Sequence, residues 1–285
     1  MNAEGEVTVE KEQLKALLAE LQSRILGQDA VLHQIVPLLQ MGELGLRDPR
    51  RPKGSFLFLG PTGVGKTETA LAFTQLLFGD DQVIRLDMSE YKTADQLAQL
   101  LGTPHSTGQL EREYKRCGRN ATLLLDEIEK AHPLFFDLLL QILDAARLTT
   151  GSGRTLDLHR YYVVMTSNLG SEALLKANSC SQVTRERFLE TQACRAFRPE
   201  TFARIDETVV FHHLSYEVCQ EIGKQALFLE QNRLSKLGHP VALSAGEARE
   251  LIQSSFDARY GARYTVRKIT RYLQERASEA ILTES

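Results

Sequence analysis

The sequence lacks the features that mark secreted, zinc-binding or membrane-spanning proteins. Its four cysteines form no C-x-x-C pair and have no metal-ligand spacing with histidine, so neither a disulfide framework nor a zinc site is indicated. The first nine residues are acidic and polar, whereas a signal peptide is basic and then apolar. The most apolar run, residues 134–143, is interrupted by Asp137 and Gln141, so we expect no membrane-spanning helix. A cytoplasmic protein with reduced thiols is therefore expected.

The sequence also has no large excess of charge of either sign. Its 34 Lys and Arg residues nearly balance its 37 Asp and Glu residues, which gives a net charge of −3. Such a balance provides no overall attraction to nucleic acid or to anionic membranes. Basic clusters at residues 47–53 and 112–119 leave a nucleic-acid patch open as an alternative, although a solvated face or a contact within a ring suits them better. We therefore expect protein partners.

Residues 60–67 have the G-x-x-x-x-G-K-[ST] spacing of a phosphate-binding P-loop. Its glycines let backbone N–H groups approach a polyphosphate without interference from a Cβ atom. The lysine would contact the β- and γ-phosphates, and the threonine hydroxyl would hold Mg²⁺. The apolar run 55–59 suits a buried parallel strand, and residues 67–78 have helical spacing. The expected nucleotide-binding residues are Gly60, Pro61, Thr62, Gly63, Val64, Gly65, Lys66 and Thr67.

Other apolar runs alternate with helical patterns in the first part of the chain. Residues 82–87, 121–127 and 160–167 are expected to be strands, and residues 10–25 and 30–44 are expected to be helices. This alternation predicts an α/β fold, with a parallel sheet and helices on both faces. Ligands of such sheets bind beyond the carboxyl ends of the strands.

The pattern becomes helical from about residue 214, so we expect a domain boundary within residues 211–215. Helices are expected at 215–237, from a capping box that Ser244 opens, and at 262–282. Residues 241–243 are compatible with a short strand.

Three polar residues follow predicted strands at the edge where ligands bind. Asp126 and Glu127 end one strand, and Asn168 follows the next. Asp126 is placed to hold Mg²⁺ through water, and Glu127 could polarise a water molecule for attack on the γ-phosphate. The Asn168 amide could bridge the γ-phosphate and that water. Without the P-loop, all three would be ordinary loop residues.

Two arginines in the second half of the chain, Arg204 and Arg263, are further candidates. A guanidinium is a rigid fork that suits phosphate oxygens and stabilises the charge that develops in phosphoryl transfer. Taken alone, both would be surface arginines in salt bridges. The P-loop is what makes them candidates for a catalytic role.

With these residues in place, the chain resembles the second-ring AAA+ module of the Clp chaperone and unfoldase family from about residue 17 to its end. The resemblance implies ATP bound between a large α/β ATPase subdomain at 25–213 and a small helical lid at 214–285, preceded by a helical extension at 1–24. The matching segments are Ile25-Leu26-Gly27-Gln28-Asp29, residues 56–68, Asp87-Met88-Ser89-Glu90-Tyr91, residues 125–133, residues 151–155 and residues 166–170.

The resemblance also implies roles for individual residues. Arg204 would reach as a finger into the site of a neighbouring subunit, Asn168 would be the first sensor, and Arg263 would be the second sensor in its own subunit. Ile25 and Leu26 would lie near the adenine. The resemblance further implies that the subunits form a ring of six, which acts on a protein substrate with ATP and Mg²⁺ as cofactors.

The chain departs from the family pattern in the loop that grips substrate in the central pore. Family members have an aromatic residue between glycines there, whereas residues 101–110 are several residues shorter and contain no aromatic. Aromatic rings supply much contact area at low entropy cost, so a pore without them should grip an extended chain poorly. His105 is a weaker substitute. Smaller departures are Ala203, where the family usually has Asn, and Tyr264, where it usually has Pro.

Further absences bear on function. The chain has no amino-terminal substrate domain, first ring or coiled-coil insert like those of the larger relatives. No Ile-Gly-Phe or Ile-Gly-Leu tripeptide of the protease-docking kind follows Asn168, so no docking to a protease is expected.

Three hypotheses for function follow. The first is an ATP-hydrolysing ring that remodels a dedicated protein partner without full threading. The second is a conventional unfoldase or disaggregase, which could be a fragment of a longer chain, although Met1 lies near the start of the module. The third is a nucleotide-controlled scaffold or regulator that assembles on a protein or on DNA.

Overall fold

The computed structural model describes residues 9–171, 182–257 and 260–283. The chain divides into two compact units, of which the first comprises Met1–Gly60 and Lys66–Phe211 and the second comprises Pro61–Gly65 and His212–Ser285. The predicted division into an extension, an ATPase subdomain and a lid stays a prediction, and the first eight residues of the extension lie outside the described residues. Within the described part of the chain, no helix is both long enough and apolar enough to cross a membrane.

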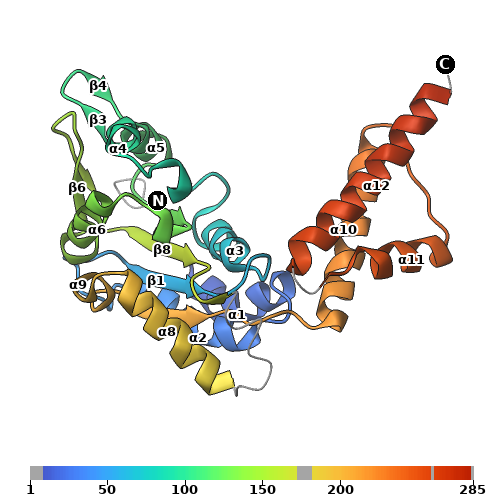
Figure 1. Cartoon of the computed structure of the whole chain (residues 1–285), viewed down its shortest axis with the longest axis horizontal. Coiled ribbons are helices and arrows are strands. Elements are labelled where there is room, and N and C mark those ends of the chain that lie inside the picture. The colour runs from blue at the N-terminus through green and yellow to red at the C-terminus, as the bar shows by residue number, and fades with distance from the viewer. Residues whose placement is uncertain (1–8, 172–181, 258–259, 284–285) are drawn as a thin grey trace. The chain divides into compact units, whose positions relative to one another are not determined.

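The first unit is built on a five-stranded parallel sheet with the strand order β2-β5-β8-β1-β9. Figure 1 labels two neighbouring strands of this sheet, β8 and β1. β1 (Gly54–Leu59), β2 (Val83–Asp87), β5 (Ala121–Asp126) and β8 (Tyr161–Ser167) lie at the four predicted runs, and the edge strand β9 (Glu207–Val210) was not predicted. Every residue of β1, β5 and β8 is buried, as expected for strands covered on both faces. The predicted α/β fold with a parallel sheet is confirmed.

Three helices close to the predicted ranges pack together on one face of the sheet. They are α1 (Lys11–Arg24), α2 (Asp29–Glu43) and α3 (Lys66–Phe78). Alternate residues of the strands point to this face. The ring centroids of Phe56 in β1 and Phe73 in α3 are 6.3 Å apart, which is within the usual range for aromatic pairs.

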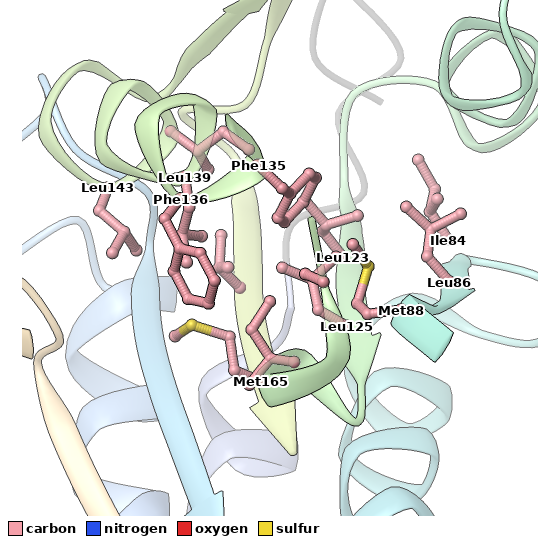
Figure 2. Packing of buried hydrophobic residues seen from close by; sticks show 14 of the residues in the cluster. Ile84, Leu86, Met88, Leu123, Leu125, Phe135, Phe136, Leu139, Leu143 and Met165 are labelled. Atoms are coloured by element: carbon pink, nitrogen blue, oxygen red, sulfur yellow. The ribbon is translucent and has the colours of Figure 1, made fainter. Parts of the chain in front are cut away.

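A second set of helices packs against the strand side chains that point to the opposite face of the sheet, and together they form one buried cluster. The helices are α4 (Ala94–Leu101), α5 (Gln109–Cys117), α6 (Pro133–Ala145) and α8 (Gln182–Ala196). Figure 2 shows how α6 packs side chains over those of the sheet. The labelled residues are Phe135, Phe136, Leu139 and Leu143 from α6, and Ile84, Leu86, Met88, Leu123, Leu125 and Met165 from the strands and the residue after β2.

The most apolar run of the sequence is the amphipathic helix α6. Asp137 and Gln141, which interrupt that run, are exposed, whereas Phe135, Leu139 and Ile142 are buried. The spacing of the buried residues follows the helical repeat, so the two polar residues mark the outer face of a core helix.

Two short hairpins, neither of them predicted, lie next to each other in the first unit. The N–H of Gly151 in the second hairpin donates to the Leu101 carbonyl at 2.9 Å, and a Cβ at Gly151 would lie 2.0 Å from the Gly102 oxygen. Only glycine fits this approach. The first hairpin pairs β3 (Gly102–Thr103) with β4 (Ser106–Thr107), and the second pairs β6 (Arg147–Thr149) with β7 (Thr155–Asp157).

Other short elements among the described residues are the 3₁₀ helices η1 (Met88–Glu90) and η2 (Ile128–Lys130) and the helix α9 (Pro199–Phe202).

Ala146 ends α6 in a left-handed conformation, with φ 43° and ψ 37°. A residue with a Cβ atom is less stable in this conformation than in the right-handed one by roughly 1–2 kcal/mol, whereas glycine adopts both. Ala146 is also fully buried, so Ala146→Gly relieves this conformation but loses a methyl group worth about 0.8 kcal/mol. We expect its free energy of unfolding, measured by chemical denaturation, to stay within about 0.5 kcal/mol of the wild-type value. The control Ala145→Gly lies inside the helix and should lower the free energy of unfolding by about 1 kcal/mol. A loss in Ala146→Gly larger than that in Ala145→Gly would contradict the strain at Ala146.

The described residues of the second unit form three helices, α10 (Tyr216–Lys236), α11 (Ala245–Ser255) and α12 (Gly261–Thr283). The Ser215 hydroxyl caps α10 by accepting the Val218 N–H at 3.3 Å. The predicted capping box of α11 is present, with Ser244 Oγ accepting the Glu247 N–H at 3.2 Å. These caps satisfy N–H groups that have no partner inside the helix.

The prediction of a short strand at residues 241–243 is wrong. Val241 and Leu243 pack against the buried cluster of the second unit, and the Val241 carbonyl accepts the Gln231 side-chain N–H at 2.9 Å. The described residues of the second unit contain no strand that could pair with them. A β-strand requires a partner for its backbone groups, so this segment is an irregular connection.

Candidate functional site

The loop between β1 and α3 requires glycine at the predicted P-loop positions. The φ angle is 141° at Gly60, 79° at Gly63 and 106° at Gly65, and residues with side chains rarely adopt such angles. At Gly60 a Cβ would also lie 2.5 Å from the Phe211 carbonyl oxygen. α3 begins at Lys66, so the N–H groups of its first turn have no acceptor within the helix. A glycine-rich turn followed by a helix start is a backbone arrangement that binds anions.

Lys66 is buried and its ammonium group lies among oxygen acceptors. Lys66 is 7% exposed. Its Nζ donates to the Gly60 carbonyl and, at 2.7 Å, to Asn168 Oδ1. Asn168 follows β8, whereas Lys66 begins α3, so the tertiary structure joins two predicted site residues that are 102 positions apart. A buried cation at the start of a helix, beside a glycine-rich loop, is suited to an anionic ligand.

Asp126 is buried at the end of β5 and is bonded on both carboxylate oxygens. Oδ1 accepts the hydroxyls of Thr67 and Thr166, each at 3.0 Å. Oδ2 accepts Arg85 Nε at 2.8 Å. The predicted metal ligands Thr67 and Asp126 are therefore in contact, and a hydroxyl with a carboxylate is a hard oxygen donor set that fits Mg²⁺.

Glu127 has an unusual backbone conformation for a residue with a long side chain. Its φ of 54° and ψ of 47° are left-handed, and its N–H donates to Thr166 Oγ1 at 3.2 Å. Non-glycine residues in this region often lie at functional sites, where the surrounding structure holds them.

The Glu127 carboxylate lies between an ammonium and an amide. Lys130 Nζ donates to Oε2, and Asn168 Nδ2 lies 3.5 Å from Oε1. The hydrogen bond to Glu127 raises the pKa of Lys130, so this ammonium stays charged at neutral pH. Asn168 is itself held by its N–H, which donates to Glu129 Oε1 at 3.2 Å. Asn168 therefore contacts both Lys66 and Glu127, the predicted phosphate ligand and base.

Sequence reasoning missed three residues of this cluster, namely Arg85, Lys130 and Thr166. Thr166 is a hydroxyl within an apolar strand, which is a local signal, but its place next to Asp126 follows from the pairing of β8 with β5. Arg85 lies on β2, which pairs with β5 on its other side. Their contacts with Asp126 depend on the strand order β2-β5-β8, which no local pattern states.

Arg204 lies away from this edge of the sheet. It precedes β9, whereas Asp126 and Asn168 follow the carboxyl ends of β5 and β8, and all these strands are parallel. Arg204 Nε donates to Asp144 Oδ2 in α6, and Nη1 donates to the Glu200 carbonyl. The structure therefore does not bring Arg204 to the site of its own chain.

Arg263 is exposed near the start of α12 in the second unit. The preceding residue, Ala262, donates its N–H to the Gly63 carbonyl at 3.0 Å, so within this unit α12 begins beside the glycine-rich loop. Ile25 is buried after α1 and Leu26 is half-buried. The proximity of Ile25 and Leu26 to an adenine stays a prediction.

The hairpin β3–β4 occupies the position of the predicted substrate loop. Thr103, Pro104, His105, Ser106 and Thr107 are all exposed. The Thr103 and Ser106 hydroxyls bond each other at 2.8 Å, and the His105 N–H donates to Thr103 Oγ1 at 3.3 Å, so the turn is tied to itself. The exposed surface of this turn consists of hydroxyls, one proline and one imidazole.

The basic clusters noted in the sequence have partners within the chain. Such ion pairs fit the expectation that these clusters are structural or solvated rather than sites for nucleic acid. The pairs are Arg47 with Asp206, Arg50 with Asp48, Lys53 with Glu43, Lys115 with Glu111 and Arg116 with Glu113. The segment that lacks a protease-docking tripeptide lies partly outside the described residues, at 172–181.

Comparisons with known proteins match this chain over most of its length. A family model described as the AAA domain (Cdc48 subfamily) matches residues 51–208. The chaperone protein ClpB 1 of Synechococcus elongatus is 40% identical over 97% of the chain, and the Clp protease ATP-binding subunit ClpC of Staphylococcus aureus is 36% identical over 96%. The chain spans 32% and 35% of the length of these relatives.

A solved structure has the same fold. It is the closed-state reconstruction of Hsp104 with ATPγS and FITC casein, which matches with a TM-score of 0.85 and 31% identity. The match covers 95% of this chain and 48% of the Hsp104 chain.

Proposed function

The chain belongs to the AAA domain family (Cdc48 subfamily), and we propose that it is an ATP-hydrolysing module whose subunits form a ring that remodels a dedicated protein partner. One observation carries the ATPase part of this proposal. Lys66, Thr67, Asp126, Glu127 and Asn168 come from α3 and from the ends of β5 and β8, and together with Thr166 they form one hydrogen-bonded cluster at the carboxyl edge of the sheet. The cluster supplies a phosphate-binding cation, metal ligands and a base.

The proposed binding step uses the P-loop and the acidic strand end. Backbone N–H groups of residues 60–65 and Lys66 Nζ bind the β- and γ-phosphates of ATP. The Thr67 hydroxyl and the Asp126 carboxylate hold Mg²⁺, and Arg85 and Thr166 orient that carboxylate. Mg²⁺ supplies charge neutralisation at the phosphate oxygens.

The proposed hydrolytic step uses Glu127 as general base. Its carboxylate accepts a proton from the attacking water. To do so, the carboxylate must either separate from Lys130 or bind the water while it stays paired with Lys130. The Asn168 amide, which contacts Lys66 and lies near Glu127, orients that water and senses the γ-phosphate. Arg263, at the start of α12, acts as the second sensor, and Ile25 and Leu26 lie near the adenine.

The ring part of the proposal rests on Arg204. It precedes β9, at the opposite end of the parallel strands from Asp126, so it is suited to a neighbouring copy rather than to its own site. A ring of six with residues 25–213 as the ATPase subdomain and 214–285 as the lid accounts for a finger that acts between subunits. Such a head-to-tail contact closes into a ring when the rotation allows it.

The protein-remodelling part of the proposal is supported by the relatives' names. ClpB is named a chaperone, and the Hsp104 structure contains casein. The exposed hairpin β3–β4 is short and offers no aromatic side chain, which favours action on a dedicated partner without full threading. A conventional unfoldase or disaggregase, and an ATP-controlled scaffold or regulator, are the alternatives.

ATP turnover measured against protein concentration, with mass photometry of the same samples, tests the proposal. We expect turnover per subunit to rise cooperatively as a six-membered ring appears. A protein that binds ATP but stays monomeric and idle would favour the regulator, and hydrolysis stimulated by DNA would favour a scaffold on DNA. Efficient unfolding of casein would replace partner-specific remodelling by conventional unfolding.

Lys66→Ala is expected to lower the affinity for ATP by about one to two orders of magnitude, because charged hydrogen bonds contribute about 1.5–3 kcal/mol. The binding of a fluorescent ATP analogue measures this change. Lys92→Ala, at an exposed lysine, is the control and should bind as the wild type does. Equal affinities for Lys66→Ala and the wild type would remove Lys66 from the site.

A further inference from the structure

The turn that carries Arg204 is fixed from two sides. Within the turn, the Arg204 N–H donates to the Thr201 carbonyl at 3.1 Å and the Ile205 N–H donates to the Phe202 carbonyl at 3.2 Å. The guanidinium of Arg204 contacts Asp144 in α6, and the Arg204 carbonyl oxygen accepts a hydrogen bond from Arg51 Nη2. The backbone and the side chain of Arg204 are thus held by different residues.

Arg51 bridges three separate parts of the first unit. Besides Nη2 on the Arg204 carbonyl, Nε donates to the Leu143 carbonyl near the end of α6 at 3.0 Å. Nη1 lies 3.4 Å from Asp206 Oδ1. One planar guanidinium therefore fixes the distances between α6, the Arg204 turn and the residue that precedes β9.

Asp206 connects the same turn to the strand that leads to the P-loop. Its side chain is 9% exposed, and Oδ2 accepts both the N–H and the hydroxyl of Ser55, each at 2.8 Å. The Asp206 N–H in turn donates to Ser55 Oγ at 3.0 Å. Arg47 pairs with Oδ1. A buried carboxylate with this many partners is costly to disturb, so the Arg204 turn and the start of β1 form one rigid part.

We propose that Arg51, with Asp206, is a positioning residue that fixes the Arg204 turn so that the guanidinium is presented to a neighbouring copy of this chain. The inference rests on the proposed role of Arg204 between subunits. It assigns a function to Arg51 within the basic segment 47–53, which precedes β1: this residue positions the surface that acts on the neighbour. The other end of β1 opens into the chain's own P-loop, so the two functional edges share one strand.

The neighbouring Arg50 provides a matched control. Its side chain is 85% exposed and pairs with Asp48, whereas Arg51 is 30% exposed and reaches α6 and the Arg204 turn. Both arginines lie in the same loop and carry the same charge. Arg50→Met and Arg51→Met therefore change charge equally, and only the second removes the bridge.

Subunit mixing tests the inference. Arg51→Met should lower kcat about tenfold to hundredfold without changing the KM for ATP, because a finger displaced by about 1 Å loses that much rate. Arg51→Met is then mixed with an equal amount of Glu127→Gln, which supplies an intact Arg204 but cannot hydrolyse ATP. In randomly assembled rings, one site in about four combines the intact base of the first variant with the intact finger of the second, so turnover should rise to about a quarter of the wild-type value. Arg50→Met should keep wild-type turnover.

Hydrogen exchange gives a second readout that does not require a ring. Arg51→Met should speed exchange of the Arg204 and Ile205 amides by at least about tenfold, with other segments unchanged, because local opening controls exchange. Arg51→Lys, which keeps the charge but not the fork, should show an intermediate effect in both experiments.

The outcomes separate the inference from the proposed function. If Arg51→Met shows wild-type turnover and exchange, and Arg204→Ala still complements Glu127→Gln, the inference is overturned while the role of Arg204 between subunits stands. A loss in Arg51→Met that Glu127→Gln does not restore would also overturn it, because the defect would then lie in the subunit's own site. If Arg204→Ala is not complemented either, the role of Arg204 between subunits fails, and the inference fails with it.

Discussion

Glu127→Gln is expected to bind ATP with nearly unchanged affinity and to hydrolyse it about 10²–10⁴-fold more slowly, the range that a positioned general base contributes. The amide keeps the shape of the carboxylate and can still accept a hydrogen bond from Lys130, but it cannot take a proton from water. The left-handed backbone of this residue is unaffected by the change. Bound ATP should therefore persist and the assembled ring should accumulate.

Single-turnover hydrolysis and mass photometry in the presence of ATP measure both effects. Glu90→Gln, at an exposed carboxylate in η1, is the control and should retain wild-type turnover. If Glu127→Gln turns over ATP as fast as the wild type, another group is the base. A variant that also fails to bind ATP would point to a structural role in the cluster with Lys130 and Asn168.

Arg204→Ala is expected to lower the rate of ATP hydrolysis in the assembled ring by about 10³–10⁵-fold, as for arginine fingers that stabilise charge in phosphoryl transfer. The loss should appear only where subunits associate, because Arg204 and Asp126 lie at opposite ends of the parallel strands of one chain. At concentrations where the protein is monomeric, the variant and the wild type should be equally slow.

Turnover measured across a dilution series, below and above the concentration of assembly, tests this result. Arg195→Ala, at an exposed arginine in the last turn of α8, is the matched control. A wild-type monomer that hydrolyses ATP as fast as the ring would show that no residue from a neighbour is needed. Arg204 would then be a surface arginine paired with Asp144.

The convergence of the predicted site residues was predictable because it follows from parallel strands. Asp126 and Asn168 each follow a buried apolar run, and parallel strands bring their carboxyl ends to one edge of a sheet. The glycine positions were equally readable, since the positive φ angles at Gly60, Gly63 and Gly65 are local requirements of the loop. These features need no knowledge of which strand lies next to which.

The contacts of Arg85 and Thr166 with Asp126 were not predictable from local patterns. Arg85 and Thr166 reach Asp126 only because β2 and β8 flank β5, and strand order is set by the packing of helices against both faces of the sheet. The short strand β9 was missed for the same reason, because its pairing with β1 makes it a strand. The segment 241–243 shows the converse, since a strand-like composition without a partner stays irregular.

The sequence by itself determined the P-loop, four of the five strands of the sheet, and the acidic and amide residues at the strand ends, because turn chemistry and hydrophobic periodicity act over a few residues. Tertiary structure alone decided which side chains surround Asp126, and where Arg204 is held. Those relations join residues as far apart as Ser55 and Asp206, and they exist only after the strands have paired and the core has packed. Side-chain contacts of this range depend on the relative placement of whole elements, which no local pattern encodes.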